Sequence, residues 1–478
     1  MNHTHATLPR LGLAVLLAAG ILSRLAAAEA TTPAPNPSTD PFPDFGFMVS
    51  PEGYTGPVFQ LSQDYPKDLP AKSDVPAFFA KLPAAPFSPD FEAWRDYMMA
   101  VRDYCFEGNT SADPAKFATD WQVQNNPVRK WYHIPWQHYG ASGREGVHGL
   151  TREAPVANMQ LSLAQGVPAP GDNYQTYAVG FFNSFGGYTI GKVWADHMNP
   201  DLSWTTKPHG FPEGTVICKL LFVDVPASEV PFLVNPVQWT GYIQETFGNT
   251  ARSLRTVSLI QMDIAVRDDR APLGWLFGTF QYNGAVSQGP AWKNLMPVGI
   301  MWGNDPKNNG LAYTNPNPVA TRINPELKET SINADTRQLP PTHLGWNGRL
   351  NGPVDNPQSS CLSCHMTAEY PALSPMSPLF QANPPAVGSK TWMRWFENLP
   401  CATPFDPGAQ SADFSLQLAI GVTNFYEWAP PKESGLFAAA YTQSPNTAAA
   451  KKPKLLKAQA LPPGTHTFPI VRDLPQKH

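Results

Sequence analysis

Three side chains in the C-terminal third of the chain have the types and the spacing to do chemistry. They are Cys361, Cys364 and His365, in the run Cys-Leu-Ser-Cys-His. Thiols and imidazoles bind metals and form covalent bonds, so a redox pair, a zinc site and a cofactor attachment site are the candidates. A thioredoxin-like pair needs a strand before the first cysteine, and the preceding Asn-Pro-Gln-Ser-Ser does not predict one. A zinc site needs two more ligands, for which Cys401 and distant histidines are a poor supply.

The interpretation that this pattern favours is covalent attachment of haem. Two thiols separated by two residues add across the vinyl groups of a porphyrin, and the imidazole that follows the second thiol is then directed at the iron. The spacing is dictated by the macrocycle. The sequence therefore predicts one haem c attached to Cys361 and Cys364, with His365 as an iron ligand.

The second axial ligand of the iron is a separate question. Met376 is our first candidate, because a thioether suits an electron carrier and Pro375 stiffens the backbone that presents the sulfur. Met393 is the alternative, and a histidine, a lysine or an open position also stays in consideration. Methionines more often fill core space against aromatic rings, and that interpretation applies to both residues.

Other residues near or upstream of the motif are candidates for a supporting role. Arg349 and Asn351 precede the motif closely, and an arginine pairs readily with a carboxylate, so both are candidates to contact the haem propionates. The alternative interpretation is that both residues lie in a solvated loop without a ligand. His133, His138 and His148 lie among aromatic residues and predict a second metal site only if their imidazoles converge. Satisfied core or surface histidines are the more common outcome.

The N-terminus is typical of a secretory signal. Arg10 is followed by an apolar run over residues 11–22 and by Ala28-Glu29-Ala30, a small-x-small cleavage pattern. An uncleaved signal anchor is the alternative. No later run is long enough to span a membrane, so the mature chain is expected in the periplasm of a bacterium or secreted, without a membrane span.

Composition limits the classes of function. The 478-residue chain has a formal net charge of −4 with 15% charged residues, which does not suggest a nucleic-acid partner. Its 53 prolines disfavour long helices and favour a loop-rich or β-rich body. Of the five cysteines, the motif leaves Cys105, Cys218 and Cys401, any two of which an oxidising compartment can pair.

Hydrophobic periodicity predicts helices at both ends of the mature chain and strands between them. Apolar residues recur every three or four positions over 89–102, 388–399 and 413–428, where Asp413 is the expected cap of the last helix. Alternation predicts strands at 174–182, 215–225 and 257–266, and 274–282 is the expected hairpin partner of the last of these.

These elements predict an α+β protein. Its central domain is an antiparallel sandwich or half-barrel, because no helix-length segments intervene for parallel crossovers. Its C-terminal haem region is mostly helical and cytochrome c-like. The expected segments are a signal peptide (1–30), a Pro-rich extended arm (31–90), a mainly β domain (91–305), a connecting segment (306–358), the haem region (359–450) and a tail (451–478).

The haem motif resembles that of c-type cytochromes, and the whole chain resembles large bacterial proteins of the cytochrome c family. In that family haem is joined to the protein outside the cytoplasm, which agrees with the export signal. The middle region resembles, more weakly, the β-sheet cytochromes c-prime-beta and their lysine-cross-linked, hydroxylamine-oxidising relatives, through Gly-Phe-Pro-Glu-Gly-Thr at 210–215, Lys219, the strand end at 263–267 and Gly274-Trp275. In those proteins the motif ends the β domain, whereas here a connecting segment separates them, so the haem need not lie against the sheet.

The resemblance implies an electron carrier that docks a redox partner protein whose identity the sequence does not give. The alternative is a haem enzyme or a protein that binds a small gas or ligand, with an open sixth position on the iron. A third hypothesis is a β-domain that binds another molecule and delivers electrons through a fused cytochrome.

Overall fold

The computed structural model describes residues 51–81, 91–110, 121–137, 144–162, 173–245, 251–286, 290–311 and 322–428, apart from positions 52, 57, 61, 122, 198 and 341. The expected signal peptide, the expected tail and His138 lie outside the described residues. Within the described part, no helix is both long and apolar enough to cross a membrane.

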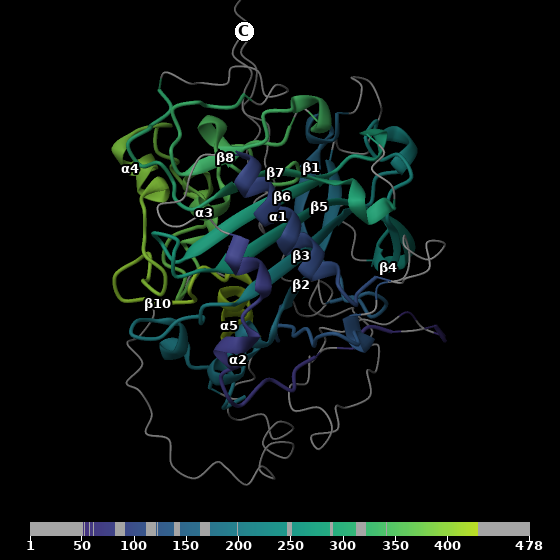
Figure 1. The fold of residues 1–478 in the computed structure, drawn as a ribbon, viewed down its shortest axis with the longest axis horizontal. Helices are drawn as coiled ribbons and strands as arrows, with labels where there is room; N and C mark the ends of the chain where they lie inside the picture. The colour runs from purple at the N-terminus through teal and green to yellow at the C-terminus, as the bar shows by residue number, and fades with distance from the viewer. Residues whose placement is uncertain are drawn as a thin grey trace, which may run out of the picture.

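One antiparallel sheet of eight strands organises the structure (Figure 1). Its strands run in the order β1-β2-β3-β5-β6-β7-β8, and β4 pairs with part of β5. The bounds are β1 Thr151–Ala157, β2 Asn173–Phe182, β3 Val216–Val223, β4 Gln238–Gln244, β5 Arg252–Arg267, β6 Trp275–Tyr282, β7 Leu295–Met301 and β8 Thr330–Ile332.

The strands predicted from alternation are confirmed as β2, β3, β5 and β6, and β5 and β6 pair as the expected antiparallel neighbours. The second layer of a sandwich is not found in the described part of the chain, where the other pairing of strands joins only β9 (Glu369–Tyr370) to β10 (Gln410–Ser411). The two faces of the sheet are covered by helices and irregular segments instead. The expected connecting segment is part of this body, because it supplies the edge strand β8.

Each face of the sheet has its own core, because successive residues of a strand point to opposite sides. The first face, called here the α1 face, buries Cys218, Leu220, Met262 and Ile264 under α1 (Phe91–Phe106), the helix expected at 89–102. The described part of the Pro-rich arm also packs here through buried phenylalanines at 59, 78 and 79, so this part is not a free extended arm.

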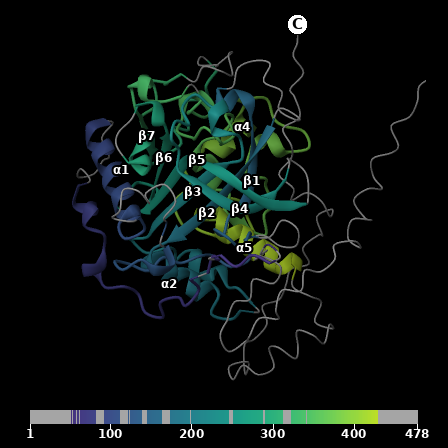
Figure 2. The ribbon, with the colours of Figure 1, turned by 90° about the vertical axis from the view of Figure 1, so that its right-hand side faces the viewer.

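The opposite face, called here the motif face, carries Ile217, Lys219, Asp263, Ala265, Phe277 and Thr279. It is covered by α2 (Ser184–Val193) and by the C-terminal part of the chain, which includes α3 (Cys361–His365), α4 (Lys390–Met393) and α5 (Leu416–Trp428). Figure 2 shows α1 and α5 on opposite sides of the sheet. The Cys-x-x-Cys-His segment therefore packs onto this face of the sheet, where Cys361 approaches Thr279 and the ring of His365 contacts that of Phe277.

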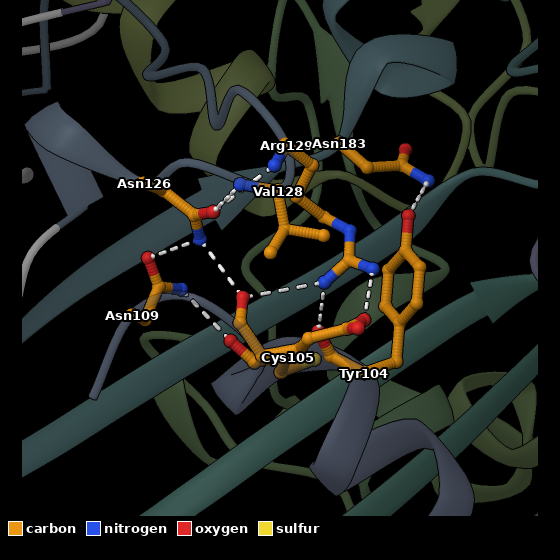
Figure 3. Close-up of polar contacts among 8 residues, drawn as sticks. Tyr104, Cys105, Asn109, Asn126, Val128, Arg129 and Asn183 are labelled. Carbon is orange, nitrogen blue, oxygen red and sulfur yellow. Dashed lines mark hydrogen bonds and ion pairs between the residues drawn. The ribbon is translucent and has the colours of Figure 1, made fainter. Parts of the chain in front are cut away.

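Hydrogen bonds hold the C-terminal end of α1 against the sheet (Figure 3). The Asn183 amide, one residue after β2, donates to the Tyr104 hydroxyl at 3.3 Å. The Arg129 guanidinium donates to the Tyr104 carbonyl oxygen at 2.6 Å, and Asn109 donates to the carbonyl oxygen of Cys105 at 2.8 Å. These bonds set the position of Cys105 on the helix end.

The three cysteines outside the motif lie on different faces of the sheet. Cys105 and Cys218 are fully buried on the α1 face, where burial raises the pKa of Cys218 and a hydrogen bond with Cys105 raises it further. Cys401 packs on the motif face, and its amide donates to the Leu273 carbonyl oxygen at 2.9 Å. All five thiols are free in this structure.

The C-terminal region contains less helix than its periodicity predicts. Of the segment 388–399 only α4 and a 3-10 turn, Arg394–Phe396, are helical. The last helix, α5, begins at Leu416, and its first turn is capped by the Ser415 hydroxyl, which accepts from Leu418 N at 3.2 Å. Asp413 is therefore not the cap: its carboxylate accepts from the Trp275 indole at 3.0 Å and ties this segment to β6.

Candidate functional site

The motif helix α3 presents its three reactive side chains on one side. Residues at positions i, i+3 and i+4 share a helix face, so Cys361, Cys364 and His365 line up, and all three are half-buried. Leu362 on the other side is fully buried in the core. The Ser360 hydroxyl caps the helix by accepting from Ser363 N at 3.2 Å, and the Ser363 hydroxyl accepts from Ser360 N at 2.8 Å. This reciprocal cap stabilises a helix that is too short to form alone.

The imidazole of His365 is held in one tautomer. Its Nδ1 lies 2.8 Å from the carbonyl oxygen of Phe414. A carbonyl only accepts, so Nδ1 carries the proton, and the lone pair of Nε2 is free to bind a metal. Burial lowers the pKa of His365 to about 4, although the Phe414 bond opposes the shift and the charge of Lys219 adds to it. The ring is therefore neutral at pH 7, as a metal ligand must be.

Both motif thiols are protonated in this environment. Burial raises the pKa of Cys364 to about 11. It also raises the pKa of Cys361, where the negative charges of Asp263 and Asp355 act in the same direction. The Cys361 sulfur lies 3.8 Å from the hydroxyl of Thr279 on β6. The two thiols thus lie against the motif face of the sheet as neutral groups, not as a thiolate redox pair.

Arg349 supports the motif helix from behind. Its fully buried guanidinium donates to the carbonyl oxygen of Asn304 at 2.8 Å, and the amide oxygen of Asn304 accepts from the Ser360 cap at 3.0 Å. The rings of Trp346 and Phe396 lie within 4.9 Å of the guanidinium carbon. Burial lowers the pKa of Arg349 to about 10. Its contact with a propionate stays a prediction, and only Nη1 lacks a partner among the described residues.

The other candidates from the sequence lie in separate surroundings. Asn351 donates to the carbonyl oxygen of Asn356 at 2.6 Å, within its own loop. His133 is buried on the α1 face and accepts from Ser62 N at 3.1 Å, while His148 approaches the carbonyl oxygen of Thr240 at 2.5 Å. No cluster of three or more histidine, cysteine or acidic side chains that could hold a metal occurs in the described ranges. Of the three histidines, His133 and His148 belong to no such cluster, and His138 lies outside the described residues.

The two methionine candidates come from segments that are bonded together beside α3. The turn Arg394–Phe396, which directly follows Met393, packs against α3. Within this turn the indole of Trp395 donates to the carbonyl oxygen of Pro375 at 2.9 Å. That bond places the backbone before Met376 next to the same turn, so both methionines lie close in sequence to a contact of this turn.

A polar row crosses the motif face beneath the motif. The strand register aligns Lys219 with Asp263 and Asp263 with Thr279 on three adjacent strands. Glycines extend the row on both sides, Gly180 next to Lys219 and Gly299 next to Thr279. Ionisable side chains in the middle of a sheet face are costly unless they are paired, so Lys219 and Asp263 each need a partner here.

Hydrogen bonds connect this row to a second carboxylate. The Gln261 amide nitrogen lies 2.9 Å from both carboxylate oxygens of Asp263 and 2.8 Å from one oxygen of Asp355. The Thr279 hydroxyl donates to Asp263 at 2.9 Å, and Lys219 pairs with Glu153 at 3.1 Å. Burial raises the pKa of Asp263 to about 7, with Asp355 adding to the shift and Lys219 opposing it.

Gln281 stands next to this network without any partner among the described residues. It pairs in register with Gln261 and lies two residues from Thr279, so it points to the motif face. The side chain is fully buried, and neither its amide oxygen nor its amide nitrogen has a hydrogen-bond partner. Such a group indicates a place for a polar ligand or water.

Several site residues were not singled out from the sequence: Asp355, Thr279, Gln281 and the carbonyl of Phe414. A signal exists for two of them, because Thr279 and Gln281 interrupt an otherwise apolar strand at alternate positions.

Comparison of the chain with known protein families, with characterised proteins and with solved structures finds no match for it.

Proposed function

We propose that this protein is an exported c-type haem protein that carries electrons, with one haem joined to Cys361 and Cys364 and ligated by His365. One observation carries the proposal. Both thiols and the imidazole lie on the same side of α3, and the Phe414 carbonyl leaves Nε2 as the free nitrogen of His365. A thioether link at two cysteines and an imidazole with its other nitrogen bonded is the arrangement that c-type haem requires.

The chemistry of the donor set fits the group. Attachment forms a carbon–sulfur bond at each vinyl while the thiol hydrogen goes to the other vinyl carbon, so it needs two thiols that are not joined to each other. Cys361 and Cys364 are free. The ring of Phe277 lies 4.6 Å from the imidazole and keeps its surroundings apolar. The haem supplies a centre that accepts and releases one electron.

Met376 remains the proposed sixth ligand, with Met393 as the alternative. The bond from Trp395 to Pro375 holds the backbone that presents Met376 and joins it to the turn that packs on α3. A ligand on a supported segment keeps the coordination the same in both oxidation states, which favours electron transfer without chemistry.

A second function has a specific observation in its favour. The buried, unpartnered amide of Gln281 and the polar row of Lys219, Asp263 and Thr279 form hydrogen-bonding surroundings beside the motif. Electron transfer by itself does not require these groups, whereas a haem enzyme or a protein that binds a small ligand at an open sixth position uses such groups.

The first experiment asks whether haem is attached. The full chain is exported together with the c-type maturation proteins, denatured, run on a gel and stained for haem peroxidase activity. We expect a stained band for the wild type, a loss of covalent haem in Cys361→Ala/Cys364→Ala, and no change in the matched control Cys401→Ala. A wild-type band without stain refutes the proposal.

Binding of carbon monoxide to the reduced protein then distinguishes the electron carrier from the enzyme or ligand-binding protein. If Met376 closes the coordination, the reduced protein binds carbon monoxide slowly or not at all. Rapid binding by the wild type shows an exchangeable sixth position and places the enzyme or ligand-binding function ahead of the carrier.

A further inference from the structure

We infer that Asp263 and Asp355 form one proton-binding site that couples uptake of a proton to reduction of the haem. The inference rests on the proposed function, since it concerns the same site. It assigns a role to a polar cluster that neither haem attachment nor iron ligation uses.

The geometry makes the two carboxylates a pair. A single amide, the –NH₂ of Gln261, lies within 2.9 Å of Asp263 and 2.8 Å of Asp355. The Gln261 orientation is set because its amide oxygen accepts from Val354 N at 3.2 Å. This –NH₂ occupies the place between the carboxylates where a cation would sit, so a proton is the positive charge that the pair can still take up.

The pair is connected to the haem attachment point. Thr279 donates to Asp263 at 2.9 Å, and the same hydroxyl lies 3.8 Å from the Cys361 sulfur. Asp263 is therefore two contacts away from the atom that becomes the thioether. Charge on the pair and charge on the haem interact at short range in a site of low dielectric.

Charged groups from each neighbouring element act on the pair. Lys219 on β3 lowers the pKa of both carboxyls, and it is itself paired with Glu153 on β1. The thiols of α3 are neutral, and so is His365 at pH 7. Two acids thus face one lysine that is already shared with a third acid, and like charges at short range cannot both be ionised without cost.

Gln281 is an independent observation that points to the same place. Its amide is fully buried, has no partner among the described residues and lies beside Gln261 and Thr279 on the motif face. A water molecule there would complete its hydrogen bonds and give the pair a route for proton exchange.

The direction of the coupling follows from charge. Reduction adds one electron, supplied by a one-electron donor protein, and removes one positive charge near the pair. The carboxyl then binds a proton from solvent more tightly, so the reduced state is favoured at low pH. The midpoint potential therefore falls as the pH rises, with a limit of about 59 mV per pH unit for one proton per electron.

The test is a spectroelectrochemical titration of the exported, haem-loaded protein between about pH 5 and pH 9. We expect the wild-type midpoint potential to fall with pH around neutrality, and Asp263→Asn and Asp355→Asn each to flatten the slope. The matched control is Asp224→Asn, a buried aspartate with a raised pKa that pairs with Arg255 away from the motif. It should keep the wild-type slope.

The outcomes separate this inference from the proposed function. A chain that never acquires covalent haem refutes both. A haem-loaded chain whose potential is independent of pH, or whose slope survives in both Asn variants, refutes the coupling alone. If neither Asn variant folds, a redox-difference infrared spectrum of the wild type decides: a protonated-carboxyl band that grows on reduction supports the pair, and its absence overturns it.

Discussion

Replacing Arg349 by methionine tests what holds the motif helix in place. The guanidinium donates to the backbone carbonyl oxygens of Asn304, Asp305 and Asn308 at 2.6–2.9 Å, and Arg349 is fully buried. A methionine of similar volume fills the space but leaves these acceptors without their donor.

The expected loss in the free energy of unfolding follows from these hydrogen bonds. A hydrogen bond from a charged donor is worth about 1.5–3 kcal/mol, and part of the loss of three is offset because a guanidinium no longer has to be desolvated. We expect Arg349→Met to lower the free energy of unfolding by about 3–5 kcal/mol.

Urea unfolding of the haem-free background Cys361→Ala/Cys364→Ala, with and without Arg349→Met, measures this loss. Arg337→Met is the control, because that side chain is 89% exposed and should change stability by no more than about 0.5 kcal/mol. A loss below about 1 kcal/mol in the haem-free protein, together with a shifted potential in the haem-loaded one, would show that Arg349 binds a haem propionate. It would refute the idea that Arg349 mainly holds the backbone behind the motif helix.

Three further predictions concern the same site. Met376→Ala should open the sixth position, lower the reduction potential and give a high-spin absorption spectrum; if only Met393→Ala does so, Met393 is the ligand, and if neither does, nitrogen or an open position replaces both. In the haem-free protein, burial holds the pKa of His365 near 4, below its unfolded value of about 6.5, so the stability that the neutral ring contributes is complete above about pH 6.5 and is lost as the pH falls toward 4. Unfolding measured across that window should show a loss of about 2–3 kcal/mol that His365→Asn abolishes, and an equal loss in this variant would contradict the assignment. A Cβ at Gly299 would lie 2.6 Å from the carbonyl oxygen of Ser331 on the neighbouring strand, so Gly299→Ala should destabilise the sheet by about 1–3 kcal/mol in thermal unfolding, and an unchanged melting temperature would show that β8 is not held there.

Elements with a strong local period were predictable. The helix α1 and the strands β3, β5 and β6 follow from the spacing of their own apolar residues, because that spacing reflects which side of the element is buried. The second sheet of the expected sandwich does not occur in the described part of the chain, and β6 shows why the sequence favoured it. All eight residues of β6 are buried, and a strand covered on both sides looks the same whether the cover is a second sheet or irregular chain.

The helices of the C-terminal region were predicted too long. Apolar spacing at 388–399 and 413–428 is helical, but Asp413 bonds to the Trp275 indole, and the chain stays irregular until Ser415 caps α5. Whether such a side chain caps a helix or bonds to a distant residue depends on its tertiary partner, and the local sequence pattern does not contain that partner.

By itself the sequence determined the motif, because the spacing of Cys361, Cys364 and His365 is a local feature fixed by four intervening peptide bonds. Only the tertiary structure decided what surrounds it. Asp355 reaches Asp263 through the amide of Gln261, which lies two residues before Asp263 on β5, and the tautomer of His365 depends on the Phe414 carbonyl. These groups are far apart along the chain, and strand register and the path of the C-terminal segment, which depend on the whole core, bring them together.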